Sequence, residues 1–467
     1  MKIILVRPVV PSRMILNCIP PIGLGYLATA LRQQGIRQVK ILDCVKDNLN
    51  YDSFRKKIAA LKPDIVGFQV FSQDLASLEK NLVIIKDIDA KIITLAGGPH
   101  PSGLPVETLK EFINLDFVFC GEAEIGLPRL VKAIVTNKNN YSRIPGLCWR
   151  DKKGQIQINA QNFFEDLDAL GFPAWDLLKP QTYPDAPQGV IFRNRPVAPI
   201  MATRGCPFSC TFCAGWTISG KKIRRRNIDH VLAEIELLYK KYGIREIHFL
   251  DDNFTLDRRY VENFCLRLLE KNFKISWCCP NGVRLDTLNE NILRLMKRAG
   301  CYYVSVGIES GSDRVLKLMK KGTTTGKIRK LVRMVNRAGM PINGFFILGF
   351  PGESKKEIMQ TIRFAKNLEL TRAAFYNYLP LPRTESYENL IASDELNAGE
   401  INWNSLFQAD VPWSPKGVTR QQLKILQRRA HLEFYLRPVI IWRLLKEIKT
   451  WEQFRYILRR AKAYLLG

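Results

Sequence analysis

Residues 203–216 read TRGCPFSCTFCAGW and place Cys206, Cys210 and Cys213 in one short segment. Gly205 and Pro207 flank the first cysteine, which is typical of a tight loop. Three thiols this close together can bind a metal ion or an iron–sulfur cluster, because thiolates are soft ligands that suit both. The segment therefore predicts a metal-binding loop, and the elements on either side indicate what that loop can do.

The cysteine spacing, C-x3-C-x2-C, helps to distinguish a zinc site from an iron–sulfur cluster. A structural zinc site normally has four ligands, and only three are local here. Cys278 and Cys279 are the candidates for a fourth, but they lie on a distant predicted strand. Three thiolates on a four-iron cluster leave one iron without a protein ligand, and that iron can bind a substrate or cofactor. A cluster with an open iron is the favoured interpretation, and a zinc site or a purely electron-transferring cluster remains the alternative.

The cysteine loop opens a second series of alternating strands and helices. Strands are predicted at 198–204, 246–251, 275–280, 302–308, 342–348 and 373–379, with helices between them. Six such strands predict an incomplete βα barrel over residues 198–395. In barrels of this type the chemistry lies at the C-terminal ends of the strands, and the cysteine loop follows the first strand at that end.

The first 135 residues predict a separate α/β domain. Five short strands alternate with helical patterns, which is typical of a doubly wound, flavodoxin-like sheet. The turns NCIPPIG, AGGPHPSG and CGEAEIG fall at the carboxyl ends of these strands, where such sheets bind ligands. Residues 136–197 predict a linker with a small hairpin over WRDKKGQIQI.

Residues 396–467 predict a basic helical extension. Residues 416–467 hold 13 basic and 3 acidic side chains in amphipathic helices. Such helices indicate either contact with a membrane surface or a cap packed on the barrel, and the cap is the favoured interpretation. The net charge of the whole chain, +27, is compatible with an anionic partner or with a solvated basic surface. GKKIRRR (220–226) is expected to face solvent, with one arginine at most turned into the site.

The sequence also indicates in which compartment the protein is expected. No apolar stretch reaches about 18 residues, so no transmembrane helix is predicted. MKIILVRPVV is interpreted as a first strand rather than as a signal peptide, because Arg7 and Pro8 shorten its apolar core. The eleven cysteines are therefore expected to be reduced in a cytoplasmic protein, with peripheral membrane contact as a variant of that location.

The cysteine spacing at the end of the first strand of a six-stranded βα barrel resembles the radical SAM superfamily. The resemblance implies a [4Fe-4S] cluster on Cys206, Cys210 and Cys213, with S-adenosylmethionine chelating the open iron. In that superfamily an electron from the cluster cleaves the sulfonium and yields a 5′-deoxyadenosyl radical. An oxygen-sensitive enzyme with an electron donor such as flavodoxin or ferredoxin is therefore expected.

Other strand-end motifs resemble the family's S-adenosylmethionine contacts. FLDDNFT (249–255) would bring its aspartates to the methionine amino group, although an Asp also caps helices. VGIESGS (306–312) would place a carboxylate on the ribose or the amino acid moiety, and FFILGFPGES (345–354) would contact adenine. Each motif alone is compatible with an ordinary turn. The residues expected to bind S-adenosylmethionine are Phe212, Asp251, Asp252, Glu309, Gly349 and Pro351.

A flavodoxin-like domain before such a barrel resembles the cobalamin-binding radical SAM class, and this resemblance covers nearly the whole chain. Many cobalamin domains carry D-x-H-x-x-G, whose histidine ligates cobalt, but here the stretch reads DCVKDN. His100 is the only histidine in the domain and is expected to line the cofactor. Cobalamin without a protein histidine ligand is therefore expected, and a degenerate domain that binds none is the alternative. The residues expected to contact it are Pro21, Gly23, Asp43, Ser72, Gly97, Gly98, His100, Gly121 and Glu122.

The resemblance implies an enzyme that methylates an unactivated carbon or phosphorus centre of a small, lipid-like or porphyrin-like molecule. Radical cyclisation, oxidation or rearrangement is the first alternative, because the family includes a ring-forming enzyme of magnesium-porphyrin metabolism with a similar basic tail. A tRNA methylthiotransferase is disfavoured, because Cys18, Cys44 and Cys120 do not fit the spacing of a second cluster, and nucleic acid is not an expected partner. A non-enzymatic cobalamin sensor is disfavoured by the intact cysteine triad. No catalytic side chain is assigned.

Overall fold

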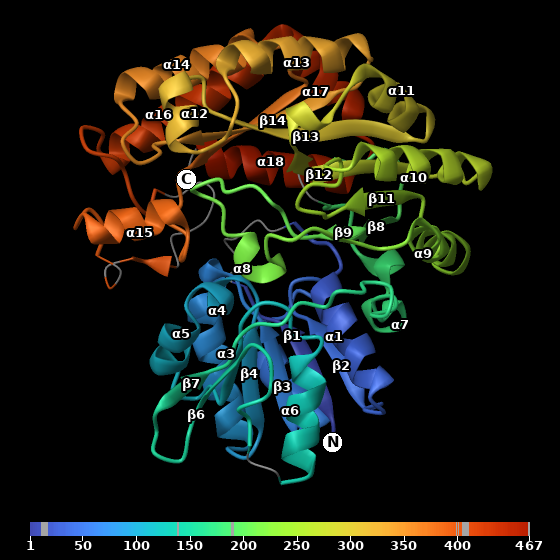
Figure 1. Cartoon of the computed structure of the whole chain (residues 1–467), viewed down its shortest axis with the longest axis vertical. Coiled ribbons are helices and arrows are strands. Elements are labelled where there is room, and N and C mark those ends of the chain that lie inside the picture. Colours follow the sequence, from blue (N-terminus) through green and yellow to red (C-terminus); the bar gives the residue numbers. More distant parts are fainter. Residues whose placement is uncertain are drawn as a thin grey trace.

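A computed structural model of the chain describes residues 1–10, 17–137, 140–187, 191–397, 399, 401–403 and 411–465. Figure 1 shows two α/β units, the N-terminal one below and the cysteine-loop one above. Short stretches of the expected C-terminal extension, 398, 400, 404–410 and 466–467, lie outside the described residues. Within the described residues, no helix is both long enough and apolar enough to span a membrane.

The N-terminal unit is built on a sheet of seven strands in the order β2-β1-β3-β4-β5-β6-β7. Its first five strands are parallel and in the order of a flavodoxin-like sheet, as expected. Each crossover between parallel strands needs a helix, and the helices bury apolar clusters on both faces of the sheet. The elements are β1 (Ile3–Arg7), α1 (Ile22–Gln33), β2 (Val39–Asp43), α2 (Tyr51–Leu61), β3 (Ile65–Gln69), η1 (Ser72–Asp74), α3 (Leu75–Ile88), β4 (Ile93–Gly97), α4 (Pro99–Gly103), α5 (Pro105–Glu111), β5 (Phe117–Phe119) and α6 (Gly126–Val135).

The hairpin predicted beyond this unit extends its sheet. β6 (Leu147–Arg150) pairs antiparallel with β5, and β7 (Ile156–Ile158) pairs antiparallel with β6. Gly154 lies in the turn between them at a φ of 75°, a conformation that glycine adopts without strain. The chain then runs through the short helices α7 (Trp175–Leu178) and η2 (Pro180–Thr182) to the second unit.

The second unit is a parallel sheet of six strands in the order β15-β14-β13-β12-β11-β8. This arrangement agrees with the predicted partial barrel. Its elements are β8 (Val197–Ile200), β9 (Thr203–Arg204), α8 (Trp216–Ser219), β10 (Arg224–Arg225), α9 (Ile228–Lys241), β11 (Glu246–Phe249), α10 (Arg258–Glu270), β12 (Ser276–Val283), η4 (Leu285–Thr287), α11 (Glu290–Arg298), β13 (Cys301–Glu309), α12 (Asp313–Leu318), α13 (Thr325–Arg337), β14 (Ile342–Leu348), α14 (Lys355–Asn367), β15 (Arg372–Asn377) and α15 (Glu385–Ala392).

The helices of the barrel begin where a polar side chain can accept a free backbone N–H of the first turn. Such caps fix each helix start and leave the apolar face of the helix to pack on the sheet. Ser354 and Glu357 form a reciprocal capping box at α14. The other capping side chains are Asn227, Asp257, Asn289, Ser312, Thr324 and Thr384.

The predicted first strand of the barrel, 198–204, is two strands. β8 ends at Ile200, and the Asp251 carboxylate then accepts the backbone N–H groups of Ala202 at 3.2 Å and Thr203 at 2.5 Å. β9 instead pairs antiparallel with β10. The sequence pattern over 198–204 is that of one continuous strand. In the structure the carboxylate of Asp251, which follows β11, accepts the backbone N–H groups of Ala202 and Thr203 and so interrupts that strand.

The C-terminal extension forms three helices, α16 (Arg420–Tyr435), α17 (Pro438–Glu447) and α18 (Trp451–Leu465). α16 packs against β15 and α14, and it buries Leu423, Leu426, Ala430 and Phe434. The Gln427 side chain donates to the carbonyl of Phe375 at 2.9 Å and accepts from Asn377 at 2.9 Å. For α16 the expected helical cap is therefore what the structure contains.

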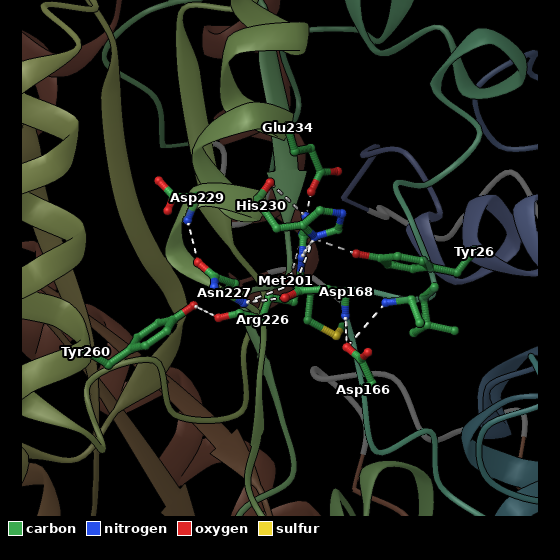
Figure 2. A network of polar contacts seen from close by, with 12 residues as sticks. Tyr26, Asp166, Asp168, Met201, Arg226, Asn227, Asp229, His230, Glu234 and Tyr260 are labelled. Atoms are coloured by element: carbon green, nitrogen blue, oxygen red, sulfur yellow. Dashed lines mark hydrogen bonds and ion pairs between the residues drawn. The ribbon is translucent and has the colours of Figure 1, made fainter.

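Buried polar networks join the two units. Figure 2 shows Arg226 at the centre of one network, beside Glu234, His230 and Tyr26 of α1. The Trp175 indole donates to Glu234 at 2.8 Å, so the linker also enters this network. Arg226 is 2 % exposed and Arg224 is 4 % exposed, so the prediction that GKKIRRR faces solvent is wrong for both. The pattern of charges could not show that carboxylates distant in the sequence would surround them.

Candidate functional site

The cysteine loop lies between β9 and α8, at the end of the barrel that faces the N-terminal unit (Figure 1). Gly205 opens the loop at a φ of 92°, and a Cβ there would lie 2.2 Å from the carbonyl oxygen of Lys222. Only glycine fits this approach. The backbone N–H of Thr211 donates to the carbonyl of Met319 at 3.1 Å, which fixes the far side of the loop.

The three loop cysteines differ from the rest in exposure. Cys206 and Cys210 are partly exposed and Cys213 is exposed, whereas the other eight cysteines are buried. Burial raises the pKa of Cys206 and Cys213 as it does that of a distant thiol such as Cys44, so exposure and spacing, rather than pKa, distinguish the loop cysteines. The structure therefore sets the loop thiols apart as the set that can ligate a cluster.

Two cations that no sequence motif marks, Arg284 and Lys321, lie beside this loop. The guanidinium of Arg284 lies 3.8 Å from the ring centroid of Phe208, and it donates to the carbonyl of Lys321 at 2.9 Å. Burial lowers the pKa of Arg284, but Asp286 and the neighbouring Cys210 and Cys206 together raise it above its usual value. Positive charges at this place offset the charge of thiolate ligands, so the donor set and its surroundings fit an iron–sulfur cluster.

Asp251 and Asp252 follow β11 and have different roles. Asp251 is buried, and both its oxygens accept hydrogen bonds, one from Ala202 before β9 and the other from Thr203, the first residue of β9. Burial raises its pKa to about 7. Its carboxylate therefore positions the chain before the cysteine loop. Asp252 is exposed, and a Cβ on Gly215 would lie 3.5 Å from its carboxylate and 3.6 Å from the Cys213 sulfur. Asp252 is thus the member of the pair that faces the loop.

Glu309 ends β13 with a φ of 66°, which is uncommon for a residue other than glycine. Lys321 donates to its carboxylate at 2.7 Å, and the Lys321 ammonium lies 5.9 Å from the ring centroid of Phe212. Burial lowers the pKa of Lys321, but Glu309 and the neighbouring Cys210 together raise it above its usual value. A strained backbone held by a buried ion pair is typical of a functional position. The structure thus brings Glu309 and Phe212 together through a lysine that the sequence pattern did not indicate.

Replacing Glu309 by Gln should weaken S-adenosylmethionine binding by about 10-fold or more, because a carboxylate acceptor is lost and Lys321 keeps a buried charge. The dissociation constant of the cluster-loaded protein, measured by isothermal calorimetry, tests this expectation. Glu388→Gln changes an exposed carboxylate on α15 and serves as the control. Equal affinities for the two variants would exclude a role for Glu309 in binding.

The 349–353 turn follows β14 and is held from inside. Glu353 accepts the backbone N–H of Gly349 at 2.7 Å and that of Phe350 at 3.1 Å. A Cβ on Gly349 would lie 2.4 Å from Leu423, so α16 covers this turn directly, while Pro351 is partly exposed beside it. Burial raises the pKa of Glu353 to about 8, and its second oxygen has no hydrogen-bond partner within the described residues.

Glu353→Gln should make stability less dependent on pH. The folded-state pKa of about 8 exceeds the usual 4.5, so the folded chain binds this proton more tightly than the unfolded chain. The stabilisation is complete below the usual pKa and is lost as pH rises through 8. The variant should therefore gain on the order of 2–4 kcal/mol relative to the wild type between pH 5 and pH 9. Guanidinium unfolding at both pH values tests this, with Glu262→Gln as an exposed control; a constant difference would contradict it.

The residues predicted to contact cobalamin fall into two groups. The first lies at the carboxyl edge of the sheet, after β3 and β4. His100 Nδ1 lies 3.0 Å from the Ser72 hydroxyl, and its ring meets Trp403 edge to face at 5.0 Å. Gly97 and Gly98 precede α4, and a Cβ on Gly98 would lie 2.9 Å from the carbonyl of Val70. Burial lowers the pKa of His100 to about 4, so this histidine is neutral at physiological pH.

Two further predicted contacts begin α1 beside the same edge. Pro21 precedes the helix, and a Cβ on Gly23 would lie 3.7 Å from the Gln69 amide at the end of β3. A glycine-lined edge with polar side chains fits a large planar cofactor, because such strand ends are where doubly wound sheets bind ligands.

The second group is engaged in other contacts. The Asp43 carboxylate accepts from the Tyr183 hydroxyl at 2.8 Å and from the N–H groups of Val45 and Lys46, each at 3.1 Å. The Gly121 N–H donates to Ser102 at 2.9 Å. These bonds satisfy Asp43 within the protein, so its role in the structure is to shape the β2 turn.

Glu122 joins the two units through buried ion pairs. Arg224 donates two hydrogen bonds to its carboxylate, each of 2.7 Å, and Arg204 lies 3.3 Å from it. Arg204 also pairs with Glu124 at 2.8 Å. All four side chains are less than 10 % exposed. We call Glu122, Glu124, Arg204 and Arg224 the interface clamp. It connects the turn after β5 with the paired strands β9 and β10, which flank the cysteine loop.

Comparison with known proteins agrees with these observations. A family model described as "Radical SAM superfamily" matches residues 200–365, and one described as "B12 binding domain" matches residues 12–131. The chain is 34% identical to "Uncharacterized methyltransferase PH0819" of Pyrococcus horikoshii over 100% of this chain and 98% of that protein. It is 30% identical to the "Cytidylyl-2-hydroxyethylphosphonate methyltransferase" of Streptomyces wedmorensis over 79% of this chain and 77% of that one.

A solved structure shares the fold of the whole chain. OxsB, a cobalamin-dependent S-adenosylmethionine radical enzyme solved with aqua-cobalamin and S-adenosylmethionine bound, has a TM-score of 0.74 at 17% identity. The match covers 100% of this chain and 72% of OxsB. A [4Fe-4S] cluster, S-adenosylmethionine and cobalamin are accordingly the cofactors of this protein. The chain belongs to the cobalamin-dependent radical SAM methyltransferase family, and it is a radical SAM enzyme.

Proposed function

We propose that this enzyme methylates an unactivated carbon or phosphorus centre of a small, partly apolar molecule. The observation that carries the proposal is the interface clamp, together with the contact between α4 and α8. α4 belongs to the carboxyl edge proposed for cobalamin and α8 follows the cluster cysteines, so the contact between these two helices brings the two proposed cofactor sites side by side. When bound, the cluster and S-adenosylmethionine supply a hydrogen-abstracting radical, and cobalamin supplies the methyl group.

Residues of both units hold these two proposed sites. Cys206, Cys210 and Cys213 are the proposed cluster ligands, and Glu309 with Lys321 is proposed to orient S-adenosylmethionine. Arg383 reaches across from the barrel: its guanidinium lies 5.3 Å from the Trp216 ring centroid and 3.4 Å from the carbonyl of Ser102. Closing the site between the two units would exclude water from a radical reaction.

The inner wall of the barrel supports a bulky, partly apolar substrate. On β14 and β15, partly exposed side chains alternate with side chains buried toward the helices. Phe345 and Tyr376 lie on the partly exposed faces, with ring centroids 5.9 Å apart. Asn343 is on the same face and donates to Ser305 at 3.1 Å. Aromatic walls with few polar groups are typical of sites for small organic molecules.

Anaerobic turnover with S-adenosylmethionine carrying a deuterated methyl group tests the proposal. The protein is loaded with cluster and cobalamin, reduced with flavodoxin or ferredoxin, and supplied with small-molecule and lipid extracts. Formation of 5′-deoxyadenosine and S-adenosylhomocysteine, with deuterium in an extract component, is the expected result. 5′-Deoxyadenosine with an altered but unlabelled extract component would replace methylation by cyclisation, oxidation or rearrangement.

A further inference from the structure

Helix α17 presents its apolar side chains outward. A surface helix normally turns its apolar stripe to the core and its polar face to solvent. Ile440 is the one buried residue of α17, all of whose residues the structure describes. Val439, Trp442 and Leu445 are 59%, 61% and 56% exposed, and Ile441 is 41% exposed. At 100° per residue these four side chains occupy one outward arc, opposite Ile440 and Glu447.

The surroundings of this arc are basic. Lys446 lies over the Trp442 ring, 4.7 Å from its centroid, and Arg443 and Lys449 are exposed nearby. The three acidic residues after position 415 are engaged elsewhere: Glu433 with Arg429, Glu447 with Arg372 and Glu452 with the backbone N–H of Asp185. Trp451, which begins α18, is 71% exposed. The outward face is therefore apolar and aromatic with a positive rim.

A cavity of about 930 Å³ adjoins the C-terminal end of α17. Lys449 and Thr450 form part of its wall, and the other walls precede β8, β11, β12 and β13 at the N-terminal end of the barrel. It is thus at the opposite end of these strands from the cluster loop. Its charged lining residues are all cations: Arg193, Arg195, Arg245, Lys274, Arg298 and Lys449. Within the described residues, Lys274, Arg298 and Lys449 have no carboxylate partner among the ion pairs.

We propose that the outward arc of α17 and this cation-lined cavity together form a docking surface for an anionic phospholipid bilayer. The phosphate of a lipid headgroup enters the cavity, and Trp442, Leu445 and Val439 enter the boundary between headgroups and acyl chains. Aromatic and apolar side chains ringed by lysine and arginine are the features of helices that lie in that boundary. Basic residues near an anionic membrane add an electrostatic attraction, which decays within about one Debye length of the membrane surface.

Charge favours a bilayer over a second copy of this chain. A twofold contact through this arc would bring Arg443, Lys446 and Lys449 of both copies together, and like charges across an interface are costly. Within the described residues, no ion pair joins Arg443, Lys446 or Lys449 to a carboxylate, whereas an anionic bilayer supplies acidic groups across its whole surface. The proposal does not depend on the identity of the substrate.

Vesicle sedimentation of the full-length, cofactor-loaded enzyme tests the proposal. The probes are vesicles of phosphatidylcholine alone and of phosphatidylcholine mixed with phosphatidylglycerol. We expect at least about 10-fold stronger binding to the anionic vesicles, and we expect added salt to weaken it. Trp442→Ser with Leu445→Ser, and separately Lys274→Ser with Arg298→Ser, should each weaken it by about 10-fold or more.

Matched controls separate this surface from general charge and apolarity. Lys152→Ser with Lys153→Ser removes the same charge from the β6–β7 turn, and Ile425→Ser removes an exposed apolar side chain from α16. Both should bind as the wild type does, and all variants should keep basal S-adenosylmethionine cleavage. Equal binding by every variant, or no preference for phosphatidylglycerol, would overturn the proposal. A dimer in solution that Trp442→Ser dissolves would also overturn it and would assign the arc to a protein contact.

Discussion

Replacing Cys210 by Ala should abolish S-adenosylmethionine cleavage, with a loss of activity of about 1,000-fold or more. Three thiolates from one loop are the proposed protein ligands, so removal of one leaves the cluster with too few attachments to be retained. Cys210 is partly exposed and its side chain is not part of the apolar core. The loss should therefore appear as missing iron rather than as unfolding.

Iron content, the visible absorption of the cluster and 5′-deoxyadenosine formation measure this effect. Cys265→Ala, which removes a buried thiol from α10, is the control: it should keep a full complement of iron and activity. It is expected to cost about 1–2 kcal/mol of stability, since a small cavity is left. Retained iron in Cys210→Ala, or loss of iron in Cys265→Ala, would show that the cluster is held elsewhere.

Replacing Glu122 by Ala should uncouple S-adenosylmethionine cleavage from methyl transfer. Arg224 and Arg204 are then left buried without Glu122, and breaking a buried ion pair in this way costs about 3–5 kcal/mol. The clamp connects the turn after β5 with the residue two positions before Cys206. A misplacement of about 1 Å between reacting groups lowers rates by about 100-fold. We therefore expect 5′-deoxyadenosine to persist while methylated product falls by about that factor.

The ratio of 5′-deoxyadenosine to methylated product measures the uncoupling, and guanidinium unfolding measures the cost in stability. Glu165→Gln is a close control, because Glu165 pairs with Lys222 at 2.6 Å at the same junction but on an exposed surface. Exposed pairs contribute about 0–1 kcal/mol, so this variant should behave as the wild type does. A proportional fall of both products in Glu122→Ala would mean that the clamp only stabilises the fold.

The parts of the fold that repeat along the chain were predictable from the sequence. Alternating strand and helix patterns indicated both parallel sheets, because a buried parallel strand is a short apolar run and its crossover helix is amphipathic. The cysteine spacing indicated the cluster loop, because all three proposed ligands lie within eight consecutive residues. The glycine- and proline-rich turns at strand ends indicated the edge at which His100, Ser72 and Gly98 meet.

Other features depend on residues that are far apart in the sequence. Glu122 pairs with Arg224, 102 positions away, and the sequence pattern that predicted Glu122 as a cofactor contact gave no sign of this partner. Lys321 and Arg284 reach the cluster loop only because neighbouring strands bring their ends to the same place. The single predicted strand 198–204 is divided by Asp251, which lies 48 positions beyond Thr203. A local sequence pattern cannot indicate contacts between residues this far apart in the sequence.

Local sequence therefore determined the two sheets, the cysteine loop and the amphipathic tail, because each depends on periodicity, spacing or turn chemistry within a few residues. Only the tertiary structure decided which charges are buried and which apolar faces stay outside. It turned α16 into a cap on the barrel and left Trp442 of α17 exposed, although both helices are amphipathic and basic. The physical reason is that burial and ion pairing depend on what the rest of the chain brings alongside a residue, and that placement is a property of the folded chain.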